Sequence, residues 1–154
     1  PPIPLETRCL VLNASGGEFR VVFHNNQGET RRRGAPCLTI VFGQNQNSRS
    51  VLGVGNPCEE GPLLFTTSVE RMLVARSDTT VKKTWWVHID DKTGWVNIGA
   101  GKRPSAKTVL LSGRLADSRH LRWSHVSFAN WQERVDLTCS FASDRVNPVQ
   151  LPSR

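Results

Sequence analysis

Short hydrophobic stretches alternate along this chain with clusters of turn-forming residues, and no stretch repeats its hydrophobic residues convincingly at helical spacing. Residues 19–24 and 134–141 alternate apolar and polar side chains with a period of two, which is typical of half-buried strands. Residues 37–42 are nearly all apolar, which is typical of a strand buried on both faces. The pattern therefore predicts antiparallel β-structure.

Two hairpins stand out. One joins residues 37–42 to residues 49–54 through a polar turn rich in Asn and Gln, and the other joins residues 85–89 to residues 95–99 through Asp-Asp-Lys-Thr-Gly. Residues 13–17 form a strong turn cluster, which we expect to end the first strand. Further strands are expected at 8–12, 63–65, 69–74, 108–111 and 121–128.

About ten short strands without an amphipathic helix predict an all-β fold, an antiparallel, jelly-roll-like β-sandwich, with a compact barrel as the alternative. The 154 residues are enough to bury one core, so we expect a single domain. Its expected limits are residues 8–142. The Pro-rich residues 1–7 are expected to form an extended arm, and the polar, Pro-containing residues 143–154 a C-terminal tail.

The formal net charge of +7 favours an acidic partner: nucleic acid, an anionic lipid surface or an acidic protein. A basic balance that merely keeps the domain soluble is the alternative. The densest basic runs are Arg31-Arg32-Arg33 and Lys102-Arg103. Neither run is interleaved with the aromatic residues that single-stranded nucleic acid binding needs.

The four cysteines have no Cys-x-x-Cys spacing, which argues against a zinc ribbon. Three of them lie in apolar strand patterns, where free Cys acts as a small core residue. Disulfides stay open if the protein is secreted, and four cysteines allow three pairings. No apolar stretch is long enough to span a membrane.

Motifs for chemistry are missing from the pattern. Residues 99–103, Gly-Ala-Gly-Lys-Arg, lack the first Gly and the final Ser or Thr of a phosphate-binding loop and fit the exit of a hairpin. The four histidines lack the spacing with carboxylates that a metal site needs, and Asp90-Asp91 fits turn chemistry. We therefore expect no catalytic residue, no metal and no cofactor.

Candidate binding residues come from three features. The amide cluster at residues 44–47 either caps a turn or offers hydrogen bonds to a sugar or peptide. Trp85 and Trp86 must face opposite sides of their strand, so one faces the second sheet and the other packs under a loop or forms a contact surface. With the basic runs, the candidates are Asn45, Asn47, Arg49, Trp86, Trp95, Arg31, Arg32, Arg33, Lys102 and Arg103.

The order of landmarks over residues 19–141 resembles the farnesoic acid O-methyltransferase (FAMeT) domain family. The residues that carry the resemblance are Ile40-Val41-Phe42-Gly43 with Asn47 and Ser50-Val51-Leu52, then Trp85-Trp86-Val87-His88-Ile89, Val96-Asn97-Ile98-Gly99-Ala100-Gly101, and His125-Val126-Ser127-Phe128-Ala129-Asn130-Trp131. The resemblance implies an all-β fold and an interaction or carbohydrate-binding-like module, despite the enzymatic name.

Together these features predict a non-enzymatic interaction or scaffold module, a subunit of a larger eukaryotic intracellular assembly. Protein partners would meet its exposed β edge, its Trp surface and its basic loops. The alternatives are a lectin-like domain that binds a carbohydrate or small ligand and an accessory subunit that binds RNA or DNA. A methyltransferase is the least favoured, because no methyl-donor site is recognisable.

Overall fold

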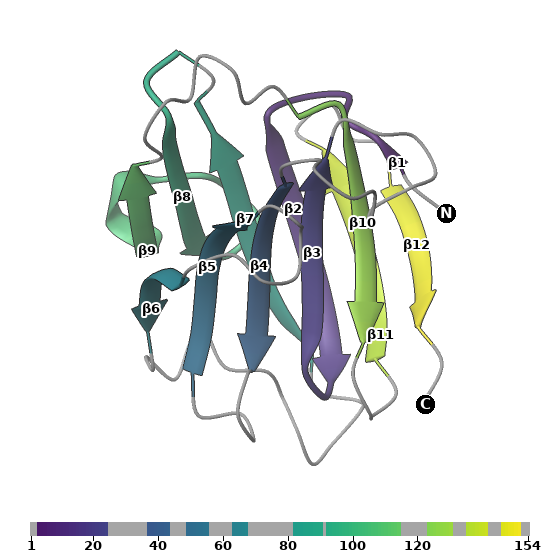
Figure 1. Cartoon of the computed structure of the whole chain (residues 1–154). Helices are drawn as coiled ribbons and strands as arrows, with labels where there is room; N and C mark the ends of the chain where they lie inside the picture. Colours follow the sequence, from purple (N-terminus) through teal and green to yellow (C-terminus); the bar gives the residue numbers. More distant parts are fainter. Residues whose placement is uncertain are drawn as a thin grey trace.

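In a computed structural model, the described residues are 3–24, 37–43, 49–55, 63–67, 82–90, 92–114, 123–130, 135–141 and 146–151. They form strands and one short 3-10 helix, η2 (Figure 1). The elements are β1 (Ile3–Pro4), β2 (Cys9–Gly16), β3 (Phe19–His24), β4 (Cys37–Gly43), β5 (Arg49–Gly55), β6 (Leu63–Thr67), β7 (Lys83–Ile89), β8 (Trp95–Ala100), η2 (Ala106–Thr108), β9 (Val109–Arg114), β10 (His125–Asn130), β11 (Val135–Phe141) and β12 (Val146–Leu151).

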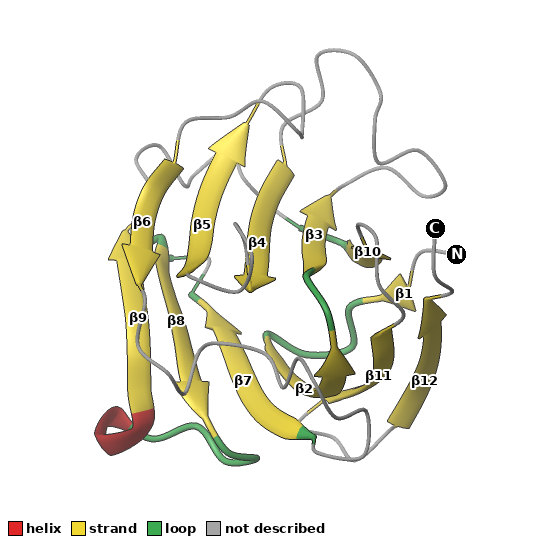
Figure 2. Ribbon diagram, turned by 90° about the horizontal axis from the view of Figure 1, so that it is seen from below, coloured by secondary structure: helices red, strands yellow, loops and turns green. Residues whose placement is uncertain are grey.

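The strands make two six-stranded sheets that face each other (Figure 2). Sheet A has the order β1-β10-β3-β4-β5-β6, and sheet B has the order β12-β11-β2-β7-β8-β9. Every strand pairing among the described residues is antiparallel. The prediction of an all-β antiparallel sandwich is confirmed.

The chain winds between the sheets. Strands β3 to β6 run as a meander in sheet A, and β7 to β9 run as a meander in sheet B. The consecutive strands β2 and β3 lie in different sheets and pair with β11 and β10 respectively, which are also consecutive. This pairing of one two-strand unit with another across two sheets is the winding expected of a jelly-roll-like sandwich.

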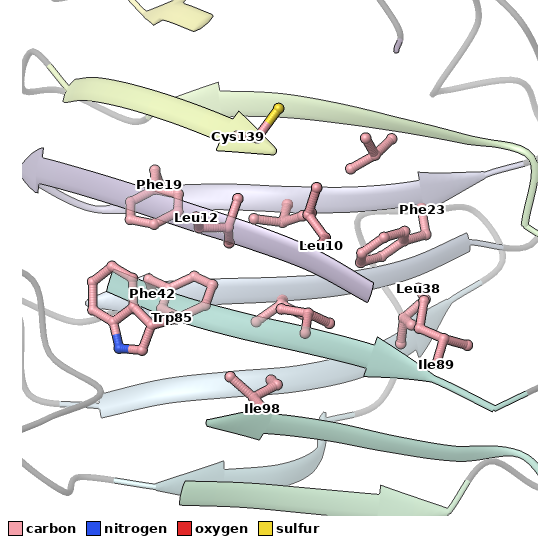
Figure 3. Packing of buried hydrophobic residues seen from close by; sticks show 14 of the residues in the cluster. Leu10, Leu12, Phe19, Phe23, Leu38, Phe42, Trp85, Ile89, Ile98 and Cys139 are labelled. Atoms are coloured by element: carbon pink, nitrogen blue, oxygen red, sulfur yellow. The ribbon is translucent and has the colours of Figure 1, made fainter. Parts of the chain in front are cut away.

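The core lies between the sheets and is rich in aromatic rings. Phe19 stacks on Phe42 from the neighbouring strand of sheet A, with ring centroids 4.8 Å apart. Trp85 of sheet B packs against Phe42 at 4.8 Å, so these rings join the two layers (Figure 3). All three side chains are fully buried. Such aromatic contacts add to the stabilisation that burial itself provides.

The first long strand, β2, runs to Gly16, so the turn predicted at residues 13–17 is wrong for most of its length. Asn13 and Ala14 pair with β11 on one side and with β7 on the other, and Ala14 is fully buried. Strand pairing on both sides outweighs the local turn preference of these residues. Only Gly17 and Glu18 remain between β2 and β3, and Gly16 has a φ of 113°.

The two ends of the chain contribute strands. Residues 146–151 form β12, which pairs along β11 from Val135 to Ser140, so the expectation that the chain beyond residue 142 is a tail is wrong for this segment. The strand covers an edge of β11 that would otherwise be open, and Pro148 is tolerated because β12 is an edge strand. The N-terminal arm is extended, and Ile3 and Pro4 pair with β10.

The other strand predictions hold approximately. Strand β9 extends to Arg114, beyond the predicted end at residue 111, and Thr108 belongs to η2. Strand β10 starts at His125, later than predicted. The buried pattern of β4 is confirmed, since only Thr39 is not buried. The strand predicted at residues 69–74 lies outside the described residues.

Candidate binding surface on sheet B

The three central strands β11, β2 and β7 bring polar side chains to the outer face of sheet B. Leu10, Leu12 and Ala14 of β2 are buried in the core, so the alternate residues Val11 and Asn13 face outward. Asn13 pairs with Thr138 of β11 on one side and with Thr84 of β7 on the other. The row Thr138–Asn13–Thr84 therefore crosses three strands on the outer face.

A second row runs parallel to the first. Val11 pairs with Ser140 of β11 and with Trp86 of β7. Four short polar side chains, two on β11 and one each on β2 and β7, thus lie next to the outward Val11, whose β7 side is taken by Trp86. They are Asn13, Thr84, Thr138 and Ser140.

The segment that follows β8 forms a wall beside these rows. Gly101 has a φ of 93°, which favours glycine, and its N–H donates to the carbonyl oxygen of Thr84 at 3.0 Å. This hydrogen bond fixes Lys102, Arg103 and Pro104 beside the first row. The sheet and this segment enclose a cleft of about 560 Å³, within the range of small-ligand sites. It is lined by Val11, Asn13, Thr84, Lys102, Arg103, Pro104, Thr138, Cys139, Ser140 and Phe141.

Several polar groups of the cleft are not fully used in hydrogen bonds to the residues that the structure describes. The hydroxyls of Thr138 and Ser140 make no hydrogen bond there. The Oδ1 of Asn13 accepts a long hydrogen bond from the Thr84 hydroxyl, at 3.5 Å, and its amide N–H groups have no acceptor there. The cleft can therefore donate and accept several hydrogen bonds to a ligand.

The charge of the cleft is positive. Lys102 and Arg103 are exposed, and neither makes an ion pair with any described residue. No carboxylate of the described residues lines the cleft. Asp136 belongs to the same face of β11 but sits opposite Ser15, one row beyond Thr138 and outside the lining. The local field at the cleft thus attracts an anionic ligand.

Trp86, a predicted binding residue, is buried beside this cleft and is only 3% exposed. Its indole lies against Gly99 of β8, where an added Cβ would come 2.3 Å from the ring. Its Nε1–H donates to Thr108 Oγ1 of η2 at 3.0 Å. Of the two alternatives for the outward Trp, the structure has the one in which it packs under a loop, so this ring offers no contact surface.

Trp95 is the exposed aromatic side chain among the described residues, at 42%. It sits opposite Arg114, whose Nε–H donates to the carbonyl oxygen of Thr93 at 3.1 Å. Trp95 starts β8 and Lys102 follows its end, so the two are about 20 Å apart along the strand. Trp95 is therefore a separate surface and does not belong to the cleft.

The structure brings together only two of the predicted binding residues, Lys102 and Arg103. Arg49 begins β5 in sheet A, the other layer. Asn45, Asn47 and the run Arg31 to Arg33 lie outside the described residues. The four polar side chains of the cleft were missed. Strand alternation places each of them on an outer face, but only the strand order shows that they are neighbours.

The turn at Asp90 follows the predicted turn chemistry. Its Oδ1 accepts hydrogen bonds from the backbone N–H of Lys92 at 2.9 Å and of Thr93 at 3.2 Å. These bonds stabilise the charged form and lower the pKa of the carboxyl group. This carboxylate is solvent-exposed and structural, which is the opposite of what a general acid requires.

Two of the histidines, His24 and His125, lie within hydrogen-bonding distance of serines. His24 Nε2 lies 2.9 Å from Ser127 Oγ, and His125 Nδ1 lies 2.8 Å from Ser124 Oγ. The two imidazole rings stack across β3 and β10, with centroids 5.9 Å apart. No group of three or more His, Cys, Asp or Glu side chains suited to a metal ion occurs among the described residues.

Two of the cysteines are free and buried, as the apolar pattern predicts: Cys9 and Cys139. Burial raises the pKa of the Cys9 thiol, and it raises the pKa of the Cys139 thiol to about 11. Both are therefore poor nucleophiles near neutral pH. Cys37 is disulfide-bonded.

No described helix is long and apolar enough to cross a membrane. No family model matches this chain, and neither does any curated protein or solved structure. The resemblance to the FAMeT domain family therefore stays a prediction.

Proposed function

We propose that this chain is a non-enzymatic binding module that meets an acidic partner through the outer face of sheet B. The observation that carries the proposal is the cleft in which Lys102 and Arg103 stand beside hydroxyl and amide groups that have spare hydrogen-bonding capacity. Cations without a carboxylate partner strengthen contact with an anionic ligand, and short polar side chains orient it.

The chemistry of the cleft supports binding rather than turnover. Its polar side chains are Asn, Thr, Ser, Lys and Arg, and no histidine or carboxylate that the structure describes lines it. Cys139 is among the lining residues, but its side chain belongs to the core. Burial raises the pKa of its thiol to about 11, so the thiol is protonated at neutral pH. A general base with a pKa near 7 is what hydrolysis or group transfer would require.

The predicted partner is a protein within a larger assembly, and Trp95 supports this part of the proposal. Trp95 is exposed and lies opposite Arg114, and Trp and Arg are among the residue types enriched where protein interfaces gain most of their binding energy. A nucleic acid partner is less favoured, because the one buried Trp next to the cleft cannot stack on a base. A methyltransferase remains the least favoured function.

The intracellular location is part of the same proposal, and one observation weighs against it. Cys37 is disulfide-bonded, and such bonds persist mainly in oxidising compartments such as the secretory pathway. Labelling of accessible thiols in the protein from its native cell, before and after reduction, distinguishes the two. An intracellular protein is expected to carry Cys37 as a free thiol.

Titration of the whole protein with three acidic probes tests the proposal: poly-L-glutamate, a tetragalacturonate and a single-stranded oligonucleotide. The double variant Lys102→Gln/Arg103→Gln is expected to weaken the tightest of the three at least about tenfold at low salt, since hydrogen bonds to charged groups contribute about 1.5–3 kcal/mol each. The wild-type affinity is expected to fall as salt rises.

The matched control is Lys92→Gln/Lys107→Gln, which removes the same charge from two exposed positions outside the cleft. It is expected to change the affinity less than about twofold, the size of a long-range electrostatic effect. If no acidic probe binds, or if both double variants weaken binding equally, the outer face of sheet B is not the binding surface.

A further inference from the structure

The cleft has features that a general docking surface for acidic proteins does not need. It lies over β11, β2 and β7, in the middle of sheet B, where every strand is already paired on both sides. A peptide therefore cannot add to it as an extra strand, which is the usual way in which sheets bind extended peptides. A ligand must be held by side chains.

The side chains suit a ligand that carries many hydroxyl groups. Thr138 and Ser140 each offer one hydroxyl that can donate and accept, and Asn13 offers two amide N–H donors. These groups come from neighbouring strands, and paired positions have Cβ atoms about 5 Å apart. Such a spacing matches a ring with hydroxyl groups on successive carbons, which can bridge two strands.

The apolar part of the lining fits the same kind of ligand. Val11 lies next to the polar side chains, between Ser140 and Trp86, and Pro104 belongs to the wall opposite β11. A saccharide ring presents C–H groups on its faces and hydroxyl groups around its rim. The apolar Val11 and Pro104 can meet the face of such a ring, while the hydroxyl and amide groups beside Val11 can meet its rim.

Lys102 and Arg103 add the requirement for an acidic group. Both are exposed and lie at one side of the cleft, directly after Gly101, whose N–H donates to the Thr84 carbonyl oxygen at 3.0 Å. Arg offers two parallel N–H donors to a carboxylate or sulfate, and Lys adds a second charge. The acidic group of the ligand is therefore expected at this side, with its hydroxyl groups over β2 and β11.

We infer that the cleft on the outer face of sheet B is a site for an acidic saccharide, a sugar unit that carries a carboxylate or sulfate group. This inference rests on the proposed function, because it names the ligand class of the same site. The volume of about 560 Å³ holds a short oligosaccharide segment rather than a folded domain.

Isothermal titration of the whole protein with four probes tests the inference. The probes are tetragalacturonate, a sulfated hexose tetrasaccharide, neutral maltotetraose and an oligoglutamate peptide of the same charge as tetragalacturonate. At least one acidic tetrasaccharide is expected to bind about tenfold or more tightly than both the neutral sugar and the peptide. The carboxylated and sulfated probes show which acidic group the Lys102–Arg103 side accepts.

The variants Thr138→Val and Ser140→Ala remove outward hydroxyls without adding charge. Each is expected to lower the affinity for the acidic tetrasaccharide about fivefold to tenfold and to leave any affinity for the peptide unchanged. Ser112→Ala is the control, because Ser112 Oγ donates to Asn97 Oδ1 on the same face but outside the cleft. Unfolding curves of the three variants that match the wild type show that any loss of binding is not caused by a loss of fold.

The outcomes separate the two proposals. Equal binding of the peptide and the acidic tetrasaccharide, with no effect of Thr138→Val, overturns the saccharide inference and leaves the proposed function in place. Failure of every acidic probe overturns both. Equal binding of maltotetraose and tetragalacturonate overturns the requirement for an acidic group.

Discussion

Trp85 and Trp86 are neighbours in β7 and are both buried, but different parts of the molecule bury them. Trp85 faces the core, where it packs against Phe42 of the opposite sheet, with ring centroids 4.8 Å apart. Trp86 faces outward and is covered by its own sheet and η2, through Gly99 and Thr108. The buried ring of Trp85 joins the two sheets, whereas the buried ring of Trp86 forms part of the outer surface beside the cleft.

The two faces of sheet B differ in the same way as the two tryptophans, and only the outer face is open to a ligand. The inner face of sheet B is filled by the side chains of the second sheet, so nothing can bind there. On the outer face, one side of the sheet is covered by Trp86 and η2, and the other side, over β2 and β11, keeps polar groups with spare hydrogen-bonding capacity. The proposed binding surface is the part of the sheet that Trp86 leaves uncovered.

The largest expected loss of stability follows from replacing Trp85, and it is larger than the loss from replacing Trp86. Trp85→Ala is expected to lower the free energy of unfolding by about 3–5 kcal/mol, because it leaves a cavity between the sheets that cannot collapse. Trp86→Ala is expected to cost less, about 2 kcal/mol, because water can enter the outer site and restore hydrogen bonds. Denaturant unfolding measures both, and equal losses would contradict the comparison.

The next largest expected loss of stability comes from disturbing the contact between Trp86 and Gly99. Gly99→Ala places a Cβ 2.3 Å from the indole, so either the ring or the strand must move. We expect a loss of about 2 kcal/mol, within the range for overpacking. In a double-mutant cycle, the same Gly99→Ala change in a Trp86→Ala background is expected to cost almost nothing. An equal cost in both backgrounds would place the strain elsewhere.

Burial of Cys139, an inward residue of β11, makes the stability of the protein sensitive to alkali. Cys139 points into the core, and its thiol pKa is raised to about 11 from an ordinary value of 9.0. Between these two pH values the thiol ionises in the unfolded chain but not in the folded one. Stability is therefore unaffected below about pH 9 and falls by up to about 2 kcal/mol as the pH rises to 11.

This pH effect is measured as the dependence of the denaturation midpoint on pH, in the wild type and in Cys139→Ala. The variant is less stable at every pH, but its loss between pH 9 and 11 is expected to be smaller by the thiol's contribution. Lysines titrate in both proteins and cancel in the difference. Parallel curves would show that the thiol is accessible to water.

The smallest expected effect concerns the cover of Trp86. Thr108→Val keeps the shape of the side chain and removes the acceptor of the 3.0 Å hydrogen bond from the indole Nε1–H. The loss is expected to be about 1 kcal/mol, the usual value for one hydrogen bond. Near-ultraviolet circular dichroism, together with denaturation, reports the changed indole environment. An unchanged spectrum and stability would show that packing alone holds the ring.

The sequence was sufficient to predict which segments form strands of a two-layered sandwich, but not which strands lie next to each other. Period-two alternation predicted β3 and β11, and the all-apolar run predicted β4, because burial of side chains acts residue by residue. The pattern did not decide whether Trp86 packs under a loop or forms a contact surface. Its packing depends on Gly99, 13 positions further along the chain, which leaves room for the indole.

The failures have a common cause. Asn13 and Ser15 have strong turn preferences, and residues 146–151 are polar and contain Pro148, yet all lie in strands because β11 pairs with both segments. Pairing across the sequence outweighs local preference, and strand order is not written in any one segment. The cleft was missed for the same reason, since Thr84 and Thr138 meet only through β2.

Amide-resolved NMR of the labelled protein during titration with tetragalacturonate shows directly whether the ligand binds in the cleft on the outer face of sheet B. The backbone amides around Asn13, Thr84, Lys102 and Thr138 are expected to shift together with one dissociation constant, while those around Trp95, at the other end of β8, stay in place. Shifts centred on Trp95 or on the strands of sheet A, with the cleft unchanged, would contradict the account.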